Sequence, residues 1–327
     1  MRISNMHHKV MHTKVWSALE FIRIFNMTMP FTSGFIGVVI ASKGVPLTVN
    51  SFSGMVIPVL LWAGGQAFND IFDLDVDKIN TPYRAVPSGR FSVRGALAFG
   101  GTLTLAGLTL SVLTKSFLCQ LLTLSAVVSS NLYSYKTKRQ GLSGHITFAF
   151  CVLLCIYIGQ SAVSGEIISL YAPLGIFLYH IAINIMASVG DVPGDKKTNV
   201  ITLPVQVGKI PATYAASLFW IAGVGWSVWF SEFTVQWLVI ILAVVLISVY
   251  NSQLLLRYPS PGNATTTLRL FRLGTILLQF SLVIHYLTVV QITALLLGIG
   301  VFTVSTFILF EVPKGIHDPL KGVAVHE

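Results

Sequence analysis

Apolar residues fill long, nearly uninterrupted stretches of this chain, and short polar segments separate them. A helix needs about 20 predominantly apolar residues to cross the hydrocarbon core of a bilayer. Ten stretches approach or exceed that length, so the pattern predicts an all-α, polytopic membrane protein. The expected spans are residues 16–41, 50–72, 93–113, 117–135, 143–163, 167–190, 211–230, 234–256, 267–288 and 291–311.

Composition agrees with this pattern. Of the 327 residues, 54% are hydrophobic and only 10% are charged, whereas soluble domains carry about 25% charged residues. Residues 1–15 are basic and lack an early apolar core followed by a small-residue cleavage site. We therefore expect no cleaved signal peptide, and the first span should itself act as the membrane anchor.

The distribution of basic side chains predicts the topology. Of the 21 lysines and arginines, 18 lie in the two terminal segments or in loops that follow even-numbered spans. Cytoplasmic loops carry such an excess, so the N-terminal segment 1–15 and the C-terminal tail 312–327 are both expected in the cytoplasm. The net charge of +9 is then explained by topology and an anionic ligand, and we expect no nucleic acid partner.

Four aspartates follow the second apolar run, in the sequence NDIFDLDVD. On a helix, Asp70, Asp73 and Asp77 have i, i+3, i+7 spacing and share one face with the neighbouring Asn69, whereas Asp75 points away. Carboxylates at the end of a membrane span are costly, which makes a functional role the first hypothesis. Clustered hard oxygen ligands suit Mg²⁺, which usually binds through a few carboxylates plus substrate phosphates.

A second acidic pair, Asp191 and Asp195, occupies the equivalent end of span six. Because the two clusters are four spans apart, the sequence suggests two four-helix-like halves that face each other across a shared site. Pro193 and Gly194 lie between the two aspartates and predict a break in the helix at that point.

These motifs resemble those of the UbiA-type intramembrane prenyltransferases. NDIFDLDVDKIN fits the family's NDxxDxxxD signature, GDVPGDKKTNVITLPVQVG fits its second aspartate motif, and YSYKTKRQGLSG resembles its Tyr…Lys-Arg loop. Over residues 16–290 the resemblance implies a domain of nine helices around a central cavity. It also implies an enzyme that moves an isoprenoid from a prenyl diphosphate to an acceptor. The tenth span, 291–311, lies beyond the family pattern.

The resemblance and the charge pattern together indicate binding residues. Two acidic clusters would repel a diphosphate, so Mg²⁺ should bridge the carboxylates to phosphate oxygens and stabilise the leaving group as the allylic C–O bond ionises. The expected metal ligands, or their immediate neighbours, are Asn69 and the five catalytic candidates Asp70, Asp73, Asp77, Asp191 and Asp195. The expected cationic contacts to the diphosphate are Arg23, which matches a family arginine in the first span, and the loop residues Arg84, Lys138 and Arg139.

Polar residues also lie deeper in the expected membrane region. His180 and Asn184 continue the polar face of span six, and Asn131 and Tyr135 lie one turn apart at the end of span four. Polar groups that face lipid are costly, so we expect these four side chains to line the cavity, beside the prenyl chain or the acceptor. For His180 the alternative is a hydrogen bond between helices.

The sequence leaves the acceptor open. Ala187 and Ser188 stand where many family members that prenylate polar acceptors carry a charged pair, so a less charged acceptor is easier to accommodate. The main hypothesis is Mg²⁺-dependent transfer of a prenyl group to an aromatic acceptor within the lipid membrane. Alternatives are an ether-lipid synthase of the geranylgeranylglyceryl-phosphate type and a terpene cyclase that needs no acceptor. A carrier would not require two acidic clusters at one mouth.

Overall fold

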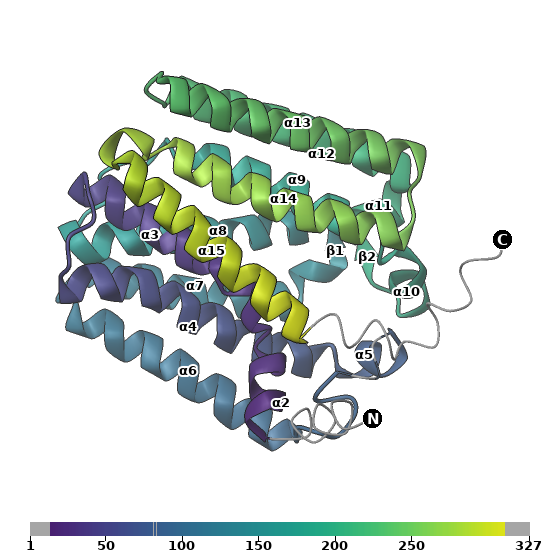
Figure 1. Ribbon diagram of the computed structural model, residues 1–327. Helices are drawn as coiled ribbons and strands as arrows, with labels where there is room; N and C mark the ends of the chain where they lie inside the picture. The colour runs from purple at the N-terminus through teal and green to yellow at the C-terminus, as the bar shows by residue number, and fades with distance from the viewer. Residues whose placement is uncertain (1–13, 81, 83, 311–327) are drawn as a thin grey trace, which may run out of the picture.

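The computed structural model describes residues 14–80, 82 and 84–310. Most of these residues are helical, and the long helices lie side by side in one bundle (Figure 1). The long helices are α3 (Thr28–Ser42), α4 (Val49–Phe72), α6 (Val93–Leu113), α7 (Phe117–Tyr135), α8 (Leu142–Ser164), α9 (Leu174–Ser188), α12 (Lys209–Trp229), α13 (Val235–Arg257), α14 (Pro261–Ser281) and α15 (Val289–Phe310).

Shorter elements connect the long helices. The short helices are α2 (Lys14–Phe21), η1 (Ile24–Asn26), α5 (Leu74–Asn80), η2 (Thr137–Arg139), α10 (Val192–Lys197), α11 (Leu203–Val207) and η3 (Ile284–Tyr286). Two strands of two residues each, β1 (Gln140–Gly141) and β2 (Ile201–Thr202), complete the described structure. The N-terminal and C-terminal segments expected in the cytoplasm lie mostly outside the described residues.

Hydroxyl side chains define where several of the long helices begin. Each of these residues accepts a hydrogen bond from the backbone N–H three positions later, which satisfies a donor that the first helical turn leaves without a partner. The N-caps of this kind are Thr48 (α4), Ser92 (α6), Ser116 (α7), Thr234 (α13) and Ser260 (α14).

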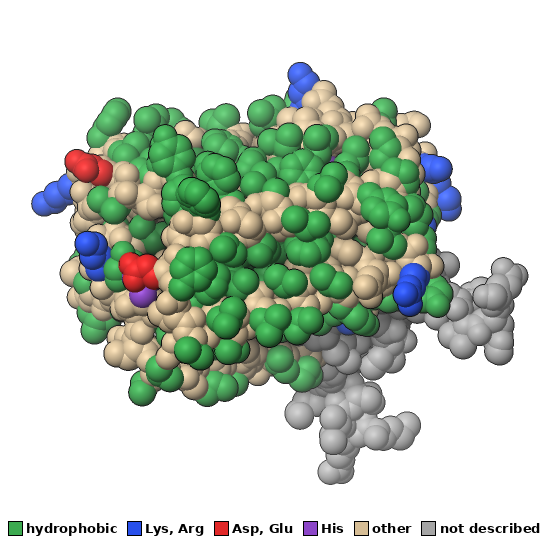
Figure 2. Space-filling view, turned by 90° about the horizontal axis from the view of Figure 1, so that it is seen from above, with side chains coloured by type: hydrophobic (Ala, Val, Ile, Leu, Met, Phe, Trp, Pro, Cys, Tyr) green, Lys and Arg blue, Asp and Glu red, His purple; other side chains and the backbone are tan. Residues whose placement is uncertain are grey.

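The all-α, polytopic prediction is confirmed. Within the described part of the chain, seven segments are long and apolar enough to cross a membrane: 24–42, 49–72, 93–113, 117–139, 142–164, 235–257 and 289–310. The other three expected spans correspond to α9, which has only 15 residues, and to α12 and α14. Hydrophobic side chains cover much of the face in Figure 2, and charged side chains lie mostly toward its two ends, as a lipid-facing surface requires.

The expected two halves are visible in the packing. Helix α4 packs extensively on α6, and α9 packs in the same way on α12. Both contacts involve paired glycines: a Cβ at Gly64 would come within 3.0 Å of the Gly100 carbonyl oxygen, and one at Gly223 within 2.7 Å of the Gly175 carbonyl oxygen. Small residues allow membrane helices to approach this closely. The two helices that lead into the acidic clusters are therefore anchored equivalently.

Helices α3 and α8 join the two halves at the centre of the bundle. A Cβ at Gly37 would overlap the carbonyl oxygen of Ile156, and a Cβ at Gly159 would overlap that of Gly34. The backbones therefore touch, and a side chain at either glycine would force them apart.

Three expected helices are shorter or broken where they approach the polar end. The first span is interrupted at Arg23, which has a left-handed backbone (φ 53°, ψ 57°) between α2 and η1. Helix α4 ends at Phe72 and a short α5 follows. Helix α9 ends at Ser188, so the predicted break precedes Pro193, which instead lies in the first turn of α10. Proline is tolerated there because that N–H has no helical partner.

Candidate functional site

The loops that carry both acidic clusters meet at one end of the bundle. Figure 1 shows α5, α10, α11 and the two strands gathered there, and α5 contacts α10. The strands pair in parallel, Gln140 with Ile201 and Gly141 with Thr202. This pairing attaches the basic loop between α7 and α8 to the loop that follows the second acidic pair.

The first cluster points into the protein. Asp70, Asp73 and Asp77 are 3%, 5% and 6% exposed, whereas the Asp75 side chain is 95% exposed and pairs with Lys78 at 3.1 Å. The backbone N–H of Asp73 donates to the carbonyl of Asn69 at 2.9 Å, and that of Asp77 donates to the carbonyl of Asp73 at 2.8 Å. The i to i+4 spacing is therefore kept on both sides of Asp73, although Asp73 itself is not α-helical. The three carboxylates consequently share one face, as their spacing indicated.

Four cations surround this cluster. Arg23 forms an ion pair with Asp70, and Lys138 forms one with Asp73. Nη1 of Arg84 donates to both carboxylate oxygens of Asp77, at 2.8 and 2.7 Å, and lies 4.0 Å from Asp70. A longer contact of 3.9 Å links Arg139 to Asp73. All four cationic residues that the sequence singled out therefore lie against the first acidic cluster.

The second pair faces the same mouth. Asp195 is 8% exposed and accepts a hydrogen bond from Thr202 Oγ1 at 3.1 Å. Burial, and to a lesser extent the negative charge of Asp191, raise its pKa to about 6. The Asp191 side chain is exposed at the surface. Desolvation by the surrounding protein nevertheless raises the pKa of its carboxyl, and the positive charges of Lys138 and Arg84 oppose that shift.

Electrostatic interactions also connect the two clusters. Asp77 acts on Asp191 and Asp73 acts on Asp195, and in both cases the neighbouring negative charge raises the pKa. Lys138 lowers the pKa of Asp191 and of Asp195 while it pairs with Asp73. The structure therefore brings the two motifs together, and Lys138 serves both.

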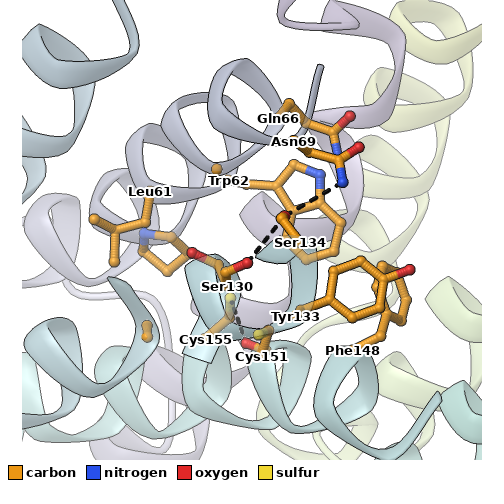
Figure 3. Close-up of a pocket in the computed structure, with 13 residues that line it drawn as sticks. Leu61, Trp62, Gln66, Asn69, Ser130, Tyr133, Ser134, Phe148, Cys151 and Cys155 are labelled. Atoms are coloured by element: carbon orange, nitrogen blue, oxygen red, sulfur yellow. Dashed lines mark hydrogen bonds between the residues drawn. The ribbon is translucent and has the colours of Figure 1, made fainter. Parts of the chain in front are cut away.

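A mostly apolar cavity of about 60 Å³ lies beside Asn69 among α4, α7 and α8 (Figure 3). The Asn69 amide donates to Ser134 Oγ at 3.3 Å in its wall. The cavity lies deeper along α4 than the aspartates do. It is lined by Pro58, Leu61, Trp62, Gly65, Gln66, Asn69, Ala126, Ser130, Tyr133, Ser134, Phe148, Cys151 and Cys155.

Two of the deeper polar predictions are wrong. Tyr135 is 70% exposed and packs edge-on against Phe72, with ring centroids 5.9 Å apart, so it faces away from the cavity. His180 is fully buried, but its Nδ1 lies 2.9 Å from the Ile176 carbonyl and its Nε2 lies 3.4 Å from Met29 Sδ. His180 therefore joins α9 to α3, which is the helix–helix alternative.

The other two deeper residues do not line this cavity either, although Asn184 contacts a residue that does. The Asn131 amide donates to the Val127 carbonyl of its own helix at 2.8 Å. Asn184 lies 2.6 Å from His145 Nδ1 and within hydrogen-bonding reach of Tyr133, which lines the cavity.

Sequence reasoning missed Tyr133 and His145. A signal for Tyr133 was present: with Ser130, Ser134 and Thr137 it forms a polar i, i+3, i+4, i+7 stripe, which places it on the inward face of α7. His145 lies in the first turn of α8, and no pattern distinguishes it.

These features define a polytopic α-helical membrane enzyme with a strongly charged mouth, in which carboxylates and cations alternate above an apolar cavity. Residues 29–276 match the model of the UbiA prenyltransferase family. The chain belongs to this family, as the motifs indicated.

Several relatives and solved structures are similar over most of their length. The chain is 31% identical to the digeranylgeranylglyceryl phosphate synthase of Sulfurisphaera tokodaii over 79% of this chain and 95% of the relative. It is 34% identical to that of Methanococcoides burtonii, over 62% and 75%.

A solved structure of digeranylgeranylglyceryl phosphate synthase superposes with a TM-score of 0.64 at 25% identity, covering 84% of this chain and 98% of that one. A UbiA homologue from Archaeoglobus fulgidus bound to GPP and Mg²⁺ gives a TM-score of 0.65 at 18% identity, covering 82% and 99%. The second likeness supports the fold.

Proposed function

We propose that this protein transfers a prenyl group from a prenyl diphosphate to the hydroxyl of a glycerol-phosphate ether lipid. The observation that carries the proposal is the pair of acidic clusters at one mouth, with Arg23, Arg84 and Lys138 held against them. Membership of a prenyltransferase family supports the reaction type. The relatives named as digeranylgeranylglyceryl phosphate synthases favour this acceptor over an aromatic ring.

The donor set suits Mg²⁺ together with a diphosphate. All five aspartates supply hard oxygen donors, and four of them are buried. Among the described residues, no group of three or more His, Cys, Asp and Glu side chains is close enough to hold an ion unaided. Mg²⁺ commonly takes one or two carboxylates and completes its shell with water and substrate phosphates. When bound, it would neutralise the charge that develops on the leaving diphosphate.

The chain's own residues would hold the reactants. Arg23, Arg84 and Lys138 would turn from their carboxylates to phosphate oxygens, for which the arginine fork is suited. The apolar cavity beside Asn69 would take the start of the prenyl chain. The allylic C–O bond breaks with its electrons leaving on the diphosphate, a hydroxyl oxygen of the acceptor bonds to the allylic carbon, and the hydroxyl proton is lost.

A phosphate on the acceptor needs a cation that is not engaged by the diphosphate. The Arg139 side chain is 40% exposed and makes only a 3.9 Å contact with Asp73. It can therefore turn toward a second anionic group, which compensates for the uncharged Ala187 and Ser188. The mouth and both termini would lie on the cytoplasmic side, because basic side chains concentrate there.

Purified protein in lipid nanodiscs, supplied with geranylgeranyl diphosphate and Mg²⁺, tests the proposal. Three parallel reactions contain geranylgeranylglyceryl phosphate, 4-hydroxybenzoate or no acceptor, and mass spectrometry identifies the products. An ether product from the first reaction supports the proposal. A product from the second alone would assign an aromatic acceptor, and a product without acceptor would indicate a cyclase.

We expect EDTA to abolish turnover and added Mg²⁺ to restore it, because the proposed leaving group needs its charge neutralised. Undiminished rates in EDTA would remove the metal role.

A further inference from the structure

Two of the cations in the first acidic cluster come from irregular segments. Arg23 lies at the left-handed junction of α2 and η1, and Arg84 lies in the turn region that follows α5. A non-glycine residue in this backbone region is strained by about 1–3 kcal/mol and persists only where its surroundings fix it. Something outside the acidic cluster must therefore hold Arg23 in place when a substrate competes for its guanidinium group. Arg84 lies outside any helix or strand, so its segment also needs support from elsewhere.

A partly buried ion pair joins these two segments. Nη1 and Nη2 of Arg90 donate to Oε2 and Oε1 of Glu20 at 2.7 and 2.9 Å, which is a bidentate fork. The Glu20 side chain is 4% exposed and that of Arg90 is 21% exposed. Arg90 also donates through Nε to Ser88 Oγ at 3.1 Å. The pair belongs to neither acidic cluster: Glu20 lies in α2, and Arg90 lies in the segment between α5 and α6.

Each partner of this pair is connected to one of the two arginines through the backbone. The N–H of Arg23 donates to the Glu20 carbonyl at 3.0 Å. On the other segment, the N–H of Ser88 donates to the Arg84 carbonyl at 3.0 Å, and the Ser88 side chain receives the Arg90 contact. A displacement at Glu20 or Arg90 therefore moves the backbone that carries Arg23 or Arg84.

Apolar packing alone does not fix this arrangement. Phe21 and Phe91 lie beside the ion pair with ring centroids 5.1 Å apart, within a small cluster that includes Ala85 and Val86. Such contacts are non-directional and tolerate rotation and sliding. A bidentate fork fixes the mutual orientation of the two segments. Arg23 and Arg84 need that fixed orientation if both are to point into the same site.

We propose that Glu20 and Arg90 are positioning residues that clamp the two arginine-bearing segments together, so that Arg23 and Arg84 present their guanidinium groups to the diphosphate. This assignment rests on the proposed function. In this proposal the two residues act through Arg23 and Arg84.

Double-mutant cycles test the coupling. Glu20→Gln should lower kcat/KM for geranylgeranyl diphosphate by about tenfold, mainly through KM, and should cause little further loss in an Arg23→Gln background. Arg90→Lys keeps the charge and loses the bidentate fork. It should also lower kcat/KM by about tenfold and cause little further loss in an Arg84→Gln background. Asp75→Asn is the matched control, because it removes an exposed carboxylate from α5 and should change kcat/KM less than twofold. Additive losses in both cycles would overturn the clamp.

Hydrogen–deuterium exchange gives a readout that needs neither metal nor turnover. In Mg²⁺-free protein, Glu20→Gln should accelerate exchange in residues 84–91 as well as 22–27, and leave the exchange of α13 unchanged. Unaltered exchange at 84–91 would overturn the proposal. If Glu20→Gln does not fold, Arg90→Lys is measured for faster exchange at 22–27. A wild-type protein that turns over no prenyl diphosphate would refute the proposed function, while the exchange experiment still decides the clamp.

Discussion

The aspartates of the first motif differ sharply in their surroundings although they are close in sequence. Asp73 is 5% exposed and pairs with Lys138 and Arg139, whereas the Asp75 side chain is 95% exposed. We expect Asp73→Asn to lower kcat by at least about a hundredfold, because it removes a charge that pairs with Lys138 and that, in the proposed function, helps to hold Mg²⁺. Asp75→Asn should retain most activity. Initial rates at saturating Mg²⁺ measure both.

Thermal unfolding of both variants in detergent serves as the control for that comparison. Asp73→Asn leaves the partly buried Lys138 with a weaker partner and should unfold at a lower temperature. Equal losses of activity for Asp73→Asn and Asp75→Asn would mean that Asp75 turns inward when substrate binds.

The same scale shows what the sequence could predict. Charged residues were assigned correctly to one mouth, because burying an unpaired charge is so costly that few arrangements remain. Neutral polar residues can be placed in more ways, because they are tolerated at the surface, in a cavity wall or between helices. Tyr135 packs on Phe72 at the surface, while Tyr133, two residues earlier, lines the cavity. Choosing between them required the helical phase of α7, and choosing a role for His180 required knowing that Met29 lies opposite it.

Among the elements, the two-residue β1–β2 pairing holds the basic loop against the second acidic loop. Gly141 has φ 57° and ψ −127°, and a Cβ there would lie 2.8 Å from Cδ of Gln206. Gly141→Ala should therefore displace Lys138 and reduce kcat/KM by about tenfold, with a backbone cost of about 1–3 kcal/mol. Kinetics and thermal unfolding in detergent measure the two effects.

Gly165 provides a matched control for Gly141. It also has a positive φ, 79°, but a Cβ there would meet no atom within 4 Å, and it ends α8 at the other end of the bundle. Gly165→Ala should carry a smaller conformational cost, because Gly165 lies in the αL region (φ 79°, ψ −5°) that L-residues can adopt, and it should leave kcat/KM unchanged. A similar loss of activity in both variants would mean that general destabilisation, and not the displaced loop, explains the effect.

Element ends were less predictable than element identities. The ten apolar runs predicted where the long helices lie because hydrophobicity in a membrane segment is a strong and local signal. The break at Arg23 has no glycine or proline to announce it. Its left-handed backbone depends on contacts with Asp70 and on the distant Arg90, through Glu20. Tertiary interactions between segments far apart in sequence decide such breaks.

Across the whole molecule, the contact between α3 and α8 unites the two halves and so fixes the distance between the acidic clusters. Gly159→Leu should force these helices apart and lower the thermal unfolding temperature in detergent by several degrees, since overpacking costs about 1–3 kcal/mol. Gly101→Ala, on α6, is the control: a Cβ there meets nothing within 4 Å. An unchanged unfolding temperature for Gly159→Leu would show that the bundle relaxes around this crossing.

The orientation of the molecule in the membrane decides which compartment supplies the diphosphate. Lys136 and Lys43 are exposed lysines in the loops after α7 and α3. The positive-inside distribution predicts that the first lies in the cytoplasm and the second outside. Each is replaced by cysteine in a background in which the buried Cys119 and Cys155 and the partly buried Cys151 are removed. An impermeant maleimide added to intact cells should label Lys43→Cys and leave Lys136→Cys unlabelled until the membrane is opened. The reverse pattern would place the acidic mouth outside the cell. The protein could then not bind prenyl diphosphate from the cytoplasm, which would contradict the proposed function.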